Sequence, residues 1–187
     1  MSDVSRQDRM AILASHRLWV ASQFTQGYCA NFSGADLSRL DLSRVDLRWA
    51  NLSGVDFTDC NLSESSFFQA DMRSTNLLRA NISQSHFMGA DLTGAYLFKA
   101  NIRESDFSGA NLTQTVACEG DFTRVNFRGA VLMGTNFENA TLVRADFREA
   151  TIGSSNFQHT DLRDADFRLT DVSTSNFAWA DLRGVIR

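Results

Sequence analysis

The side chains best suited to chemistry in this chain of 187 residues are three histidines and three cysteines: His16, His86, His159, Cys29, Cys60 and Cys118. A nucleophile needs a base within hydrogen-bond reach, and a zinc site needs ligands at close spacing. These six residues are scattered, and the sequence contains none of the common hydrolase, zinc-protease, P-loop or dinucleotide-binding motifs. We therefore expect no catalytic site, no metal and no cofactor.

Carboxylates are the other candidate catalysts, because a pair of Asp or Glu side chains can act as acid and base. Most of the Asp residues, like most of the Asn residues, occupy one fixed position of a five-residue pattern. Side chains of this kind commonly hydrogen-bond to the backbone at turns. We therefore interpret the carboxylates as structural, and we expect a smooth rod without the concave pocket that an enzyme usually needs.

The pattern is a repeat that runs without insertion or deletion from Phe32 to Leu182. Its 31 central residues are Leu, Phe, Ile, Met or Val, with the single exception of Ala117. The residue two places before the centre is Ala in 15 units and Ser or Thr in ten. The residue directly before the centre is Asp or Asn in 24 units. A helix needs apolar residues about 3.6 residues apart and a long strand needs them two residues apart, so a period of five fits neither. Each unit instead fits a short extended segment followed by a corner.

Phenylalanine indicates how many units make one coil. Six successive centres spaced 20 residues apart are all phenylalanine, whereas the centres interleaved with them at Leu77, Leu97 and Ala117 are not. Four units per coil, with stacked rings, therefore fits best. The phenylalanine column comprises Phe67, Phe87, Phe107, Phe127, Phe147 and Phe167. We name the four faces by their first centres, which are Phe32 (first), Leu37 (second), Leu42 (third) and Leu47 (fourth).

The stretches "ANFSGADLSRLDLSRVDL" and "ANLSGVDF" resemble the A(D/N)LXX consensus of the pentapeptide-repeat proteins, and the resemblance covers residues 30 to 184. It implies an all-β, right-handed quadrilateral β-helix of about eight coils. We expect residues 1–28 to form a capping helix and linker, and residues 29–187 to form the β-helix.

Both ends of a solenoid expose its core and need protection. Ser5 and Asp8 predict the start of a helix over about residues 6–22, as in a capping box. One face of that helix should cover the first coil, and His16 is interpreted there as a packed histidine rather than a ligand. This face comprises Ile12, Leu13, His16, Trp19 and Val20.

The C-terminal end carries no second helix in the sequence. Two arrangements fit it: Val185 and Ile186 fold over the end, or two rods meet there. Several pentapeptide-repeat proteins dimerise through this end, so the resemblance favours a homodimer. The candidate dimer surface comprises Phe177, Trp179, Val185 and Ile186.

Apolar residues at outward positions are the best candidates for a binding site. The second face carries such a strip over three coils: Leu78, Tyr96, Phe98, Val116 and Cys118. The fourth face has a smaller set, Phe68 and Met88 beside His86, with Trp49 one coil away. Two interpretations remain open, a partner-binding surface or drift in a tolerant repeat.

The stretch "NLTQTVACEGDF" contains the exceptional centre Ala117 but keeps the register, since Phe122 falls on schedule. We expect Ala117 to point inward, with a ring such as Phe137 filling the space beside it. If the space stayed empty, Ala117→Leu would stabilise the rod.

The sequence favours a non-catalytic module that presents a surface to a protein partner. The alternative, based on resemblance to quinolone-resistance pentapeptide proteins, is a DNA mimic that binds a type II topoisomerase such as DNA gyrase. A mimic should be strongly acidic, whereas the net charge is only −4 and Arg columns interrupt the acidic ones. We expect no direct nucleic-acid or membrane binding, and the odd, scattered cysteines suggest a reducing, cytoplasmic location.

Overall fold

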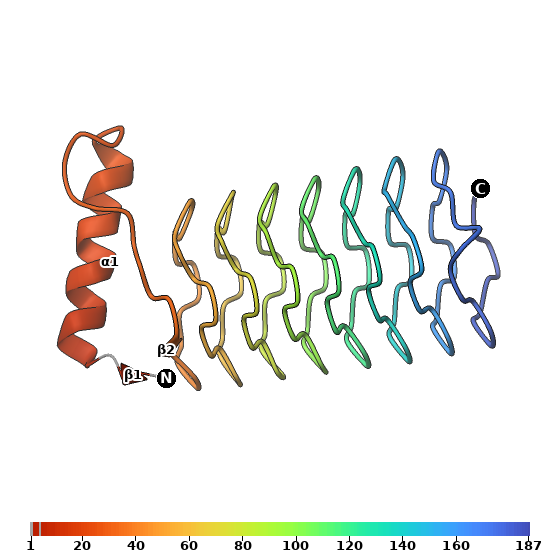
Figure 1. Cartoon of the computed structure of the whole chain (residues 1–187), viewed down its shortest axis with the longest axis horizontal. Coiled ribbons are helices and arrows are strands. Elements are labelled where there is room, and N and C mark those ends of the chain that lie inside the picture. The colour runs from red at the N-terminus through yellow and green to blue at the C-terminus, as the bar shows by residue number, and fades with distance from the viewer. Residues whose placement is uncertain (1, 4) are drawn as a thin grey trace.

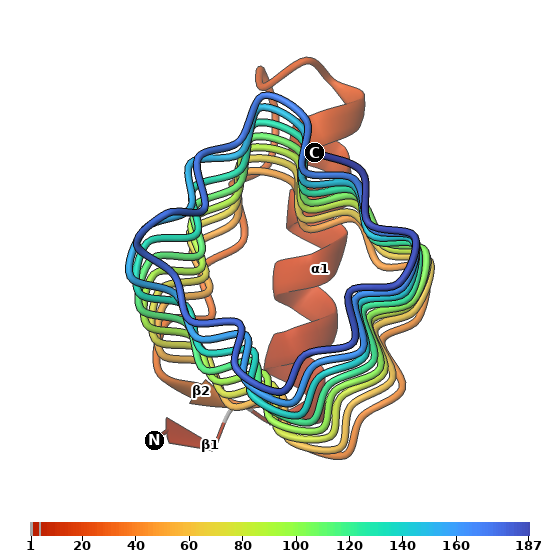
Figure 2. The same cartoon turned by 90° about the vertical axis from the view of Figure 1, so that its right-hand side faces the viewer.

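The computed structural model describes residues 2–3 and 5–187, and most of that chain forms successive coils along one axis (Figure 1). Viewed along the axis, successive coils lie over one another as a four-cornered frame (Figure 2). Each pairing joins residues 20 apart in parallel, from Asn31 with Asn51 to Asp166 with Ile186. The fold is the right-handed quadrilateral β-helix of about eight coils that the resemblance to pentapeptide-repeat proteins implied.

Hydrogen bonds between coils follow one rule on all four faces. The N–H of a central residue donates to the next coil, as Leu37 does to the carbonyl of Asp56 (2.9 Å). The N–H of the residue before a centre donates to the preceding coil, as Asp56 does to the carbonyl of Ala35 (3.0 Å). These bonds tie each coil to both of its neighbours.

The corners explain why the repeat keeps Asp or Asn before each centre. The carbonyl of Phe32 accepts from the N–H of Ala35 (2.8 Å), and Gly34 between them has φ +68°. A positive φ at this place is a feature of type II turns. The Oδ1 atom of Asp36 accepts from the N–H of Ser38 (2.9 Å). This local bonding recurs along the rod, which confirms the structural interpretation of these carboxylates.

The core is a narrow column filled by the centres and the small residues beside them. The rings of Phe67, Phe87 and Phe107 stack with centroids 4.8 and 4.4 Å apart. Buried hydroxyls are satisfied: Oγ of Ser85 donates to the carbonyl of Leu62 (2.8 Å). The period of 20 residues read from phenylalanine is thus confirmed by direct contact.

The N-terminal end is covered by helix α1 (Arg6–Ala21), which crosses the first coil (Figures 1 and 2). Oγ of Ser5 accepts from the N–H of Asp8 (3.1 Å), so the helix begins as expected. A short strand, β1 (Ser2–Asp3), pairs in parallel with β2 (Ala35–Asp36). The sequence did not predict β1, because two residues carry no periodic signal.

Candidate interaction surface

The second-face strip, defined as Leu78, Tyr96, Phe98, Val116 and Cys118, lies together on the outer surface. Tyr96 pairs with Val116 on the next coil, and the rings of Tyr96 and Phe98 are 5.9 Å apart and nearly parallel. Tyr96 is 39% exposed, and the other four side chains are half-buried. These are five apolar neighbours at positions where the repeat normally places polar side chains.

Polar groups surround the strip. Asn76 pairs with Tyr96 on one side and Asn136 pairs with Val116 on the other. The ammonium of Lys99 lies over the ring of Phe98, 5.0 Å from its centroid, and also pairs with Glu119 at 3.3 Å. An apolar centre with a polar rim is the usual composition of a small protein interface.

The cysteine of the strip contributes no charge. Burial, and then the nearby carboxylate of Glu138, raise the pKa of the Cys118 thiol. The thiol is therefore protonated at neutral pH and acts as a small apolar group.

The fourth-face patch, defined as Trp49, Phe68, His86 and Met88, is joined to the cap. Trp49 meets Phe68 edge-on at 5.5 Å, and on its other side it meets Phe24 at 5.1 Å and Trp19 at 6.1 Å. These rings hold the end of the helix against the coils. Met88 lies beyond them, 45% exposed, so only the far part of this patch is free for a partner.

Phe24 was not among the residues expected at this surface. It lies three residues beyond the end of the helix and has φ +73°, and its ring lies 4.6 Å from that of Trp19. The signal in the sequence that could have indicated this contact is an aromatic residue shortly after the predicted helix.

The expected covering face of α1 points toward the first coil. Its members, Ile12, Leu13, His16, Trp19 and Val20, are half-buried or buried, whereas Met10 and Leu18 are exposed. The side chain of His16 is fully buried, as expected of a packed histidine.

His16 links the helix to the first coil. Its Nδ1 accepts a hydrogen bond from the N–H of Ala30 (3.0 Å), while its buried Nε2 has no hydrogen-bond partner among the residues that the structure describes. Burial lowers the pKa of this imidazole. The ring is therefore neutral at pH 7, with its proton on Nε2.

At the C-terminal end, Val185 and Ile186 continue the coil. The N–H of Ile186 donates to the carbonyl of Ala165 (2.9 Å), and its carbonyl accepts from the N–H of Phe167 (2.8 Å). The arrangement in which these residues fold over the end is therefore wrong. Phe177 is half-buried against Phe157, 4.7 Å away, on the last coil.

Trp179 stands out at the same end. It is 81% exposed, and its ring stacks on His159 at 6.3 Å. The end therefore combines a half-covered core with an exposed indole.

Ala117 points inward and is fully buried, as expected. The space beside it is taken not by Phe137 alone but also by Phe122, the next centre of the same coil. The ring of Phe122 lies 5.3 Å from Phe137 and 5.9 Å from Phe127. The large ring of Phe122 thus fills the volume that the small side chain of Ala117 leaves in the core.

The charged side chains of the rod neutralise one another in pairs. Arg148, for example, binds Asp146 at 2.6 Å and approaches Asp166 at 3.8 Å. The same pairing of an arginine with the aspartate two residues before it occurs at Arg48, Arg73, Arg163, Arg168 and Arg183. Such surface pairs contribute little stability, but they prevent a continuous acidic face.

Among residues 2–3 and 5–187, no group of three or more His, Cys, Asp and Glu side chains is arranged to hold a metal ion. In the same part of the chain, no helix has the length and apolar character needed to cross a membrane.

A regular rod of five-residue units, capped by one helix and marked by an apolar strip, defines a solenoid repeat protein. The profile described as "Pentapeptide repeat region" matches residues 40–116 and 120–186, and the chain belongs to the pentapeptide-repeat family. The gap between the two matches falls on residues 117–119, where the repeat has its exceptional centre.

Solved structures of the same fold include a trypsin-treated variant of QnrB1, a plasmid-mediated fluoroquinolone resistance protein (20% identity, TM-score 0.66, 83% of this chain and 81% of that chain). HetL, a pentapeptide-repeat protein involved in heterocyst differentiation regulation from the cyanobacterium Nostoc sp. strain PCC 7120, is 20% identical, with a TM-score of 0.31 over 83% of this chain and 86% of that chain. Rfr23 from the cyanobacterium Cyanothece 51142 is 17% identical, with a TM-score of 0.29 over the same shares. No curated protein matches the sequence.

Proposed function

We propose that this protein is a non-catalytic interaction module, a rigid rod that binds a protein partner through the second-face strip. The observation that carries the proposal is the stacked pair Tyr96 and Phe98 on the outer surface, with Val116 on the neighbouring coil. Aromatic side chains dominate the binding energy of protein interfaces. A rod built from interlocked coils would present them with little loss of conformational freedom.

The strip would serve as the centre of a larger contact. Stable interfaces bury at least about 1,000 Å² in total, which is more than the five side chains of the strip supply. The surrounding amides and the Lys99–Glu119 pair would form the polar rim. The hydroxyl of Tyr96 would supply a hydrogen bond from within the apolar area.

The test is a pull-down from the native host with wild-type protein and with Phe98→Arg as baits. Met133→Arg is the matched control, because Met133 is 40% exposed on the first face. The proposal expects partners that are captured by the wild type and by the control but lost with Phe98→Arg. Equal capture by all three baits would reduce the strip to drift in the repeat.

The alternative is a DNA mimic that modulates a type II topoisomerase. Fold likeness to QnrB1 supports it only at the level of architecture, since the two chains are 20% identical. The arginine–aspartate pairs argue against it, because a duplex mimic needs uncompensated negative charge. A gyrase supercoiling assay decides the point: inhibition at micromolar protein would favour the mimic over the module.

We further propose that two copies meet at their C-terminal ends. The last coil leaves Phe177 and Val185 half-buried and Trp179 and Ile186 exposed. The exposed backbone edge at a solenoid end can also pair with another chain. A second copy would cover both.

A further inference from the structure

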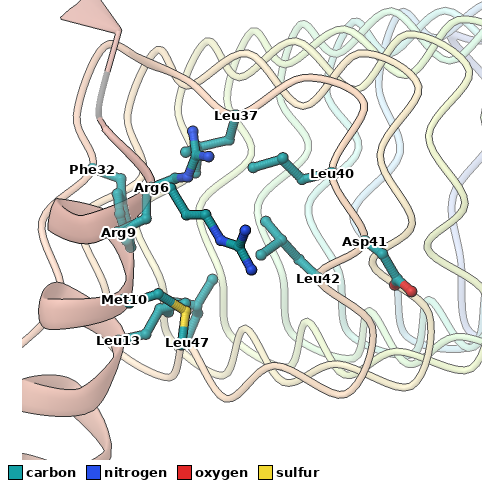
Figure 3. Close-up of a pocket in the computed structure, with 10 residues that line it drawn as sticks. All are labelled: Arg6, Arg9, Met10, Leu13, Phe32, Leu37, Leu40, Asp41, Leu42 and Leu47. Carbon is teal, nitrogen blue, oxygen red and sulfur yellow. The ribbon is translucent and has the colours of Figure 1, made fainter.

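The chain itself shows that a helix can pack on this rod through apolar side chains. Ile12 and Leu13 of α1 pack against the core. Met10 and Leu13 of the helix, together with Leu37 and Leu47 of the first coil, also line a cavity of about 420 Å³ between the two (Figure 3). The apolar face of a helix and the coils of this protein are therefore compatible surfaces.

The second-face strip is an apolar surface on the side of the rod, and its backbone carbonyls are already bonded. All five accept hydrogen bonds from the preceding coil, as Tyr96 does from the N–H of Leu77 (2.7 Å) and Cys118 does from the N–H of Lys99 (3.1 Å). Adding a strand requires a row of unpaired N–H and carbonyl groups. A partner at the strip must therefore bind mainly through side chains, and an α-helix suits this because it bonds its own backbone.

The dimensions of the strip fit one face of a helix. The strip runs along the rod over three successive coils, which carry Leu78, then Tyr96 and Phe98, then Val116 and Cys118. Two spacings between coils make its height about 10 Å. Helix residues i, i+3 or i+4, and i+7 share one face and span about the same length. A helix parallel to the rod therefore sets one apolar side chain over each coil.

One end of the strip carries a negative charge. Glu138 occupies the outward position one coil beyond Cys118, and its side chain is half-buried. Among the residues that the structure describes, its carboxylate has no ion-pair or hydrogen-bond partner, whereas the carboxylate of Glu119 pairs with Lys99 at 3.3 Å. A basic side chain of a partner would complement this charge.

We propose that the second-face strip binds an amphipathic α-helix of the partner, which lies along the rod. Its apolar residues at i, i+3 or i+4, and i+7 cover the strip, and a lysine or arginine about one turn further pairs with Glu138. The burial of apolar area supplies affinity, and the charge sets the direction and register of the helix. This inference rests on the proposed function and specifies the chemistry of the partner.

The first experiment selects 16-residue peptides from a random display library on the immobilised full-length protein. Selected peptides should bind the wild type and Met133→Arg about tenfold more tightly than Phe98→Arg, whose fold circular dichroism checks. We expect them to share apolar residues at the helical spacing, with a basic residue one turn beyond. Selected peptides with apolar residues at a period of two would overturn the helix but leave the strip as a binding site. Failure of every peptide to distinguish Phe98→Arg from the wild type would overturn the proposed function as well.

The second experiment tests the helical conformation of a selected peptide. Proline at a position between the apolar anchors keeps their side chains but breaks the helix, so it should weaken binding at least tenfold. Alanine at the same position is the matched control and should bind like the parent peptide. Equal affinities of the proline and alanine peptides would overturn the proposal.

The third experiment tests the charged end of the strip. Glu138→Gln should weaken the parent peptide about threefold and should not affect a peptide with glutamine in place of its basic residue. Glu64→Gln is the matched control, because Glu64 lies on the third face, where it pairs with Arg44 at 3.0 Å. Equal affinities of Glu138→Gln and Glu64→Gln for the parent peptide would contradict the assigned pair.

Discussion

A methyl group on Gly120 would lie 2.7 Å from Cε2 of Phe122, so the ring of Phe122 occupies the space that this repeat position usually gives to alanine. Gly120 does not have the positive φ of the corner glycines, so no turn requires it. Phe122 is also the aromatic centre on a face that otherwise has Leu or Ile at its centres. The stretch around Ala117 is therefore a redistribution of core volume rather than a worn repeat.

Gly120→Ala should destabilise the rod. The added methyl would contact the ring of Phe122 and the side chain of Ile102, and overpacking of this kind costs about 1–3 kcal/mol. Urea denaturation measures the loss. In the double variant Gly120→Ala with Phe122→Leu the clash is absent, so it should lose less than the single variant does. An unchanged midpoint for Gly120→Ala would show that the ring has room to move.

Ala117→Leu should also destabilise, by a similar amount, because Phe122 and Phe137 already pack beside this position. Combining Ala117→Leu with Gly120→Ala and Phe122→Leu rebuilds an ordinary coil, and this triple variant should recover most of the lost stability. A higher melting temperature for Ala117→Leu alone would mean that a cavity remains there.

His16 should make stability depend on pH below neutrality. Burial lowers its pKa in the folded state below the ordinary 6.5, so the unfolded chain binds the proton more readily. The contribution of the neutral His16 ring to the free energy of unfolding is fully present above pH 6.5. It is lost as the pH falls from 6.5 toward the lowered pKa of the folded state. Melting temperatures between pH 7.5 and 5 should show this fall.

The control for His16 is His16→Asn, whose amide oxygen can take the place of Nδ1 and accept from the N–H of Ala30 but does not titrate. Its melting temperature should be flat over the same window. An equally steep fall in this variant would assign the effect to other groups.

The aspartates affect stability separately, at lower pH. The guanidinium of Arg183, for example, holds the pKa of Asp181 at about 2.

The C-terminal end should mediate dimerisation. Light scattering after size exclusion should give about twice the monomer mass of 20.8 kDa for the wild type. Phe177→Asp should give the monomer, whereas Met133→Asp on the first face should remain dimeric. A monomeric wild type at tens of micromolar, or a dimeric Phe177→Asp, would contradict the proposed end-to-end contact.

The sequence was sufficient for the fold because the period of five dictates which side chains point inward. The column from Phe67 to Phe167 even revealed the number of sides, and Ser5 with Asp8 located the start of the helix. It was not sufficient for contacts between helix and coil. The position of Phe24 against Trp49 depends on how α1 docks, which no local pattern encodes.

Among the candidate sites too, some could be predicted from the sequence and others depend on how the helix docks. The second-face strip could be predicted because residues 20 apart become neighbours. The cavity under α1 could not, since it depends on what the helix leaves uncovered. The exchange of volume among Ala117, Gly120 and Phe122 was visible in the sequence as three coincident departures, but their compensation needed the ring positions.

The most direct test of the central claim is the affinity of a partner captured by the rod for Tyr96→Arg and for Met133→Arg. The two side chains are almost equally exposed, 39% and 40%, but only Tyr96 belongs to the second-face strip. We predict that Tyr96→Arg weakens binding at least tenfold, about 1.4 kcal/mol, with an unchanged melting temperature, while Met133→Arg binds like the wild type. Equal dissociation constants for the two variants would contradict the assignment of the strip as the binding site.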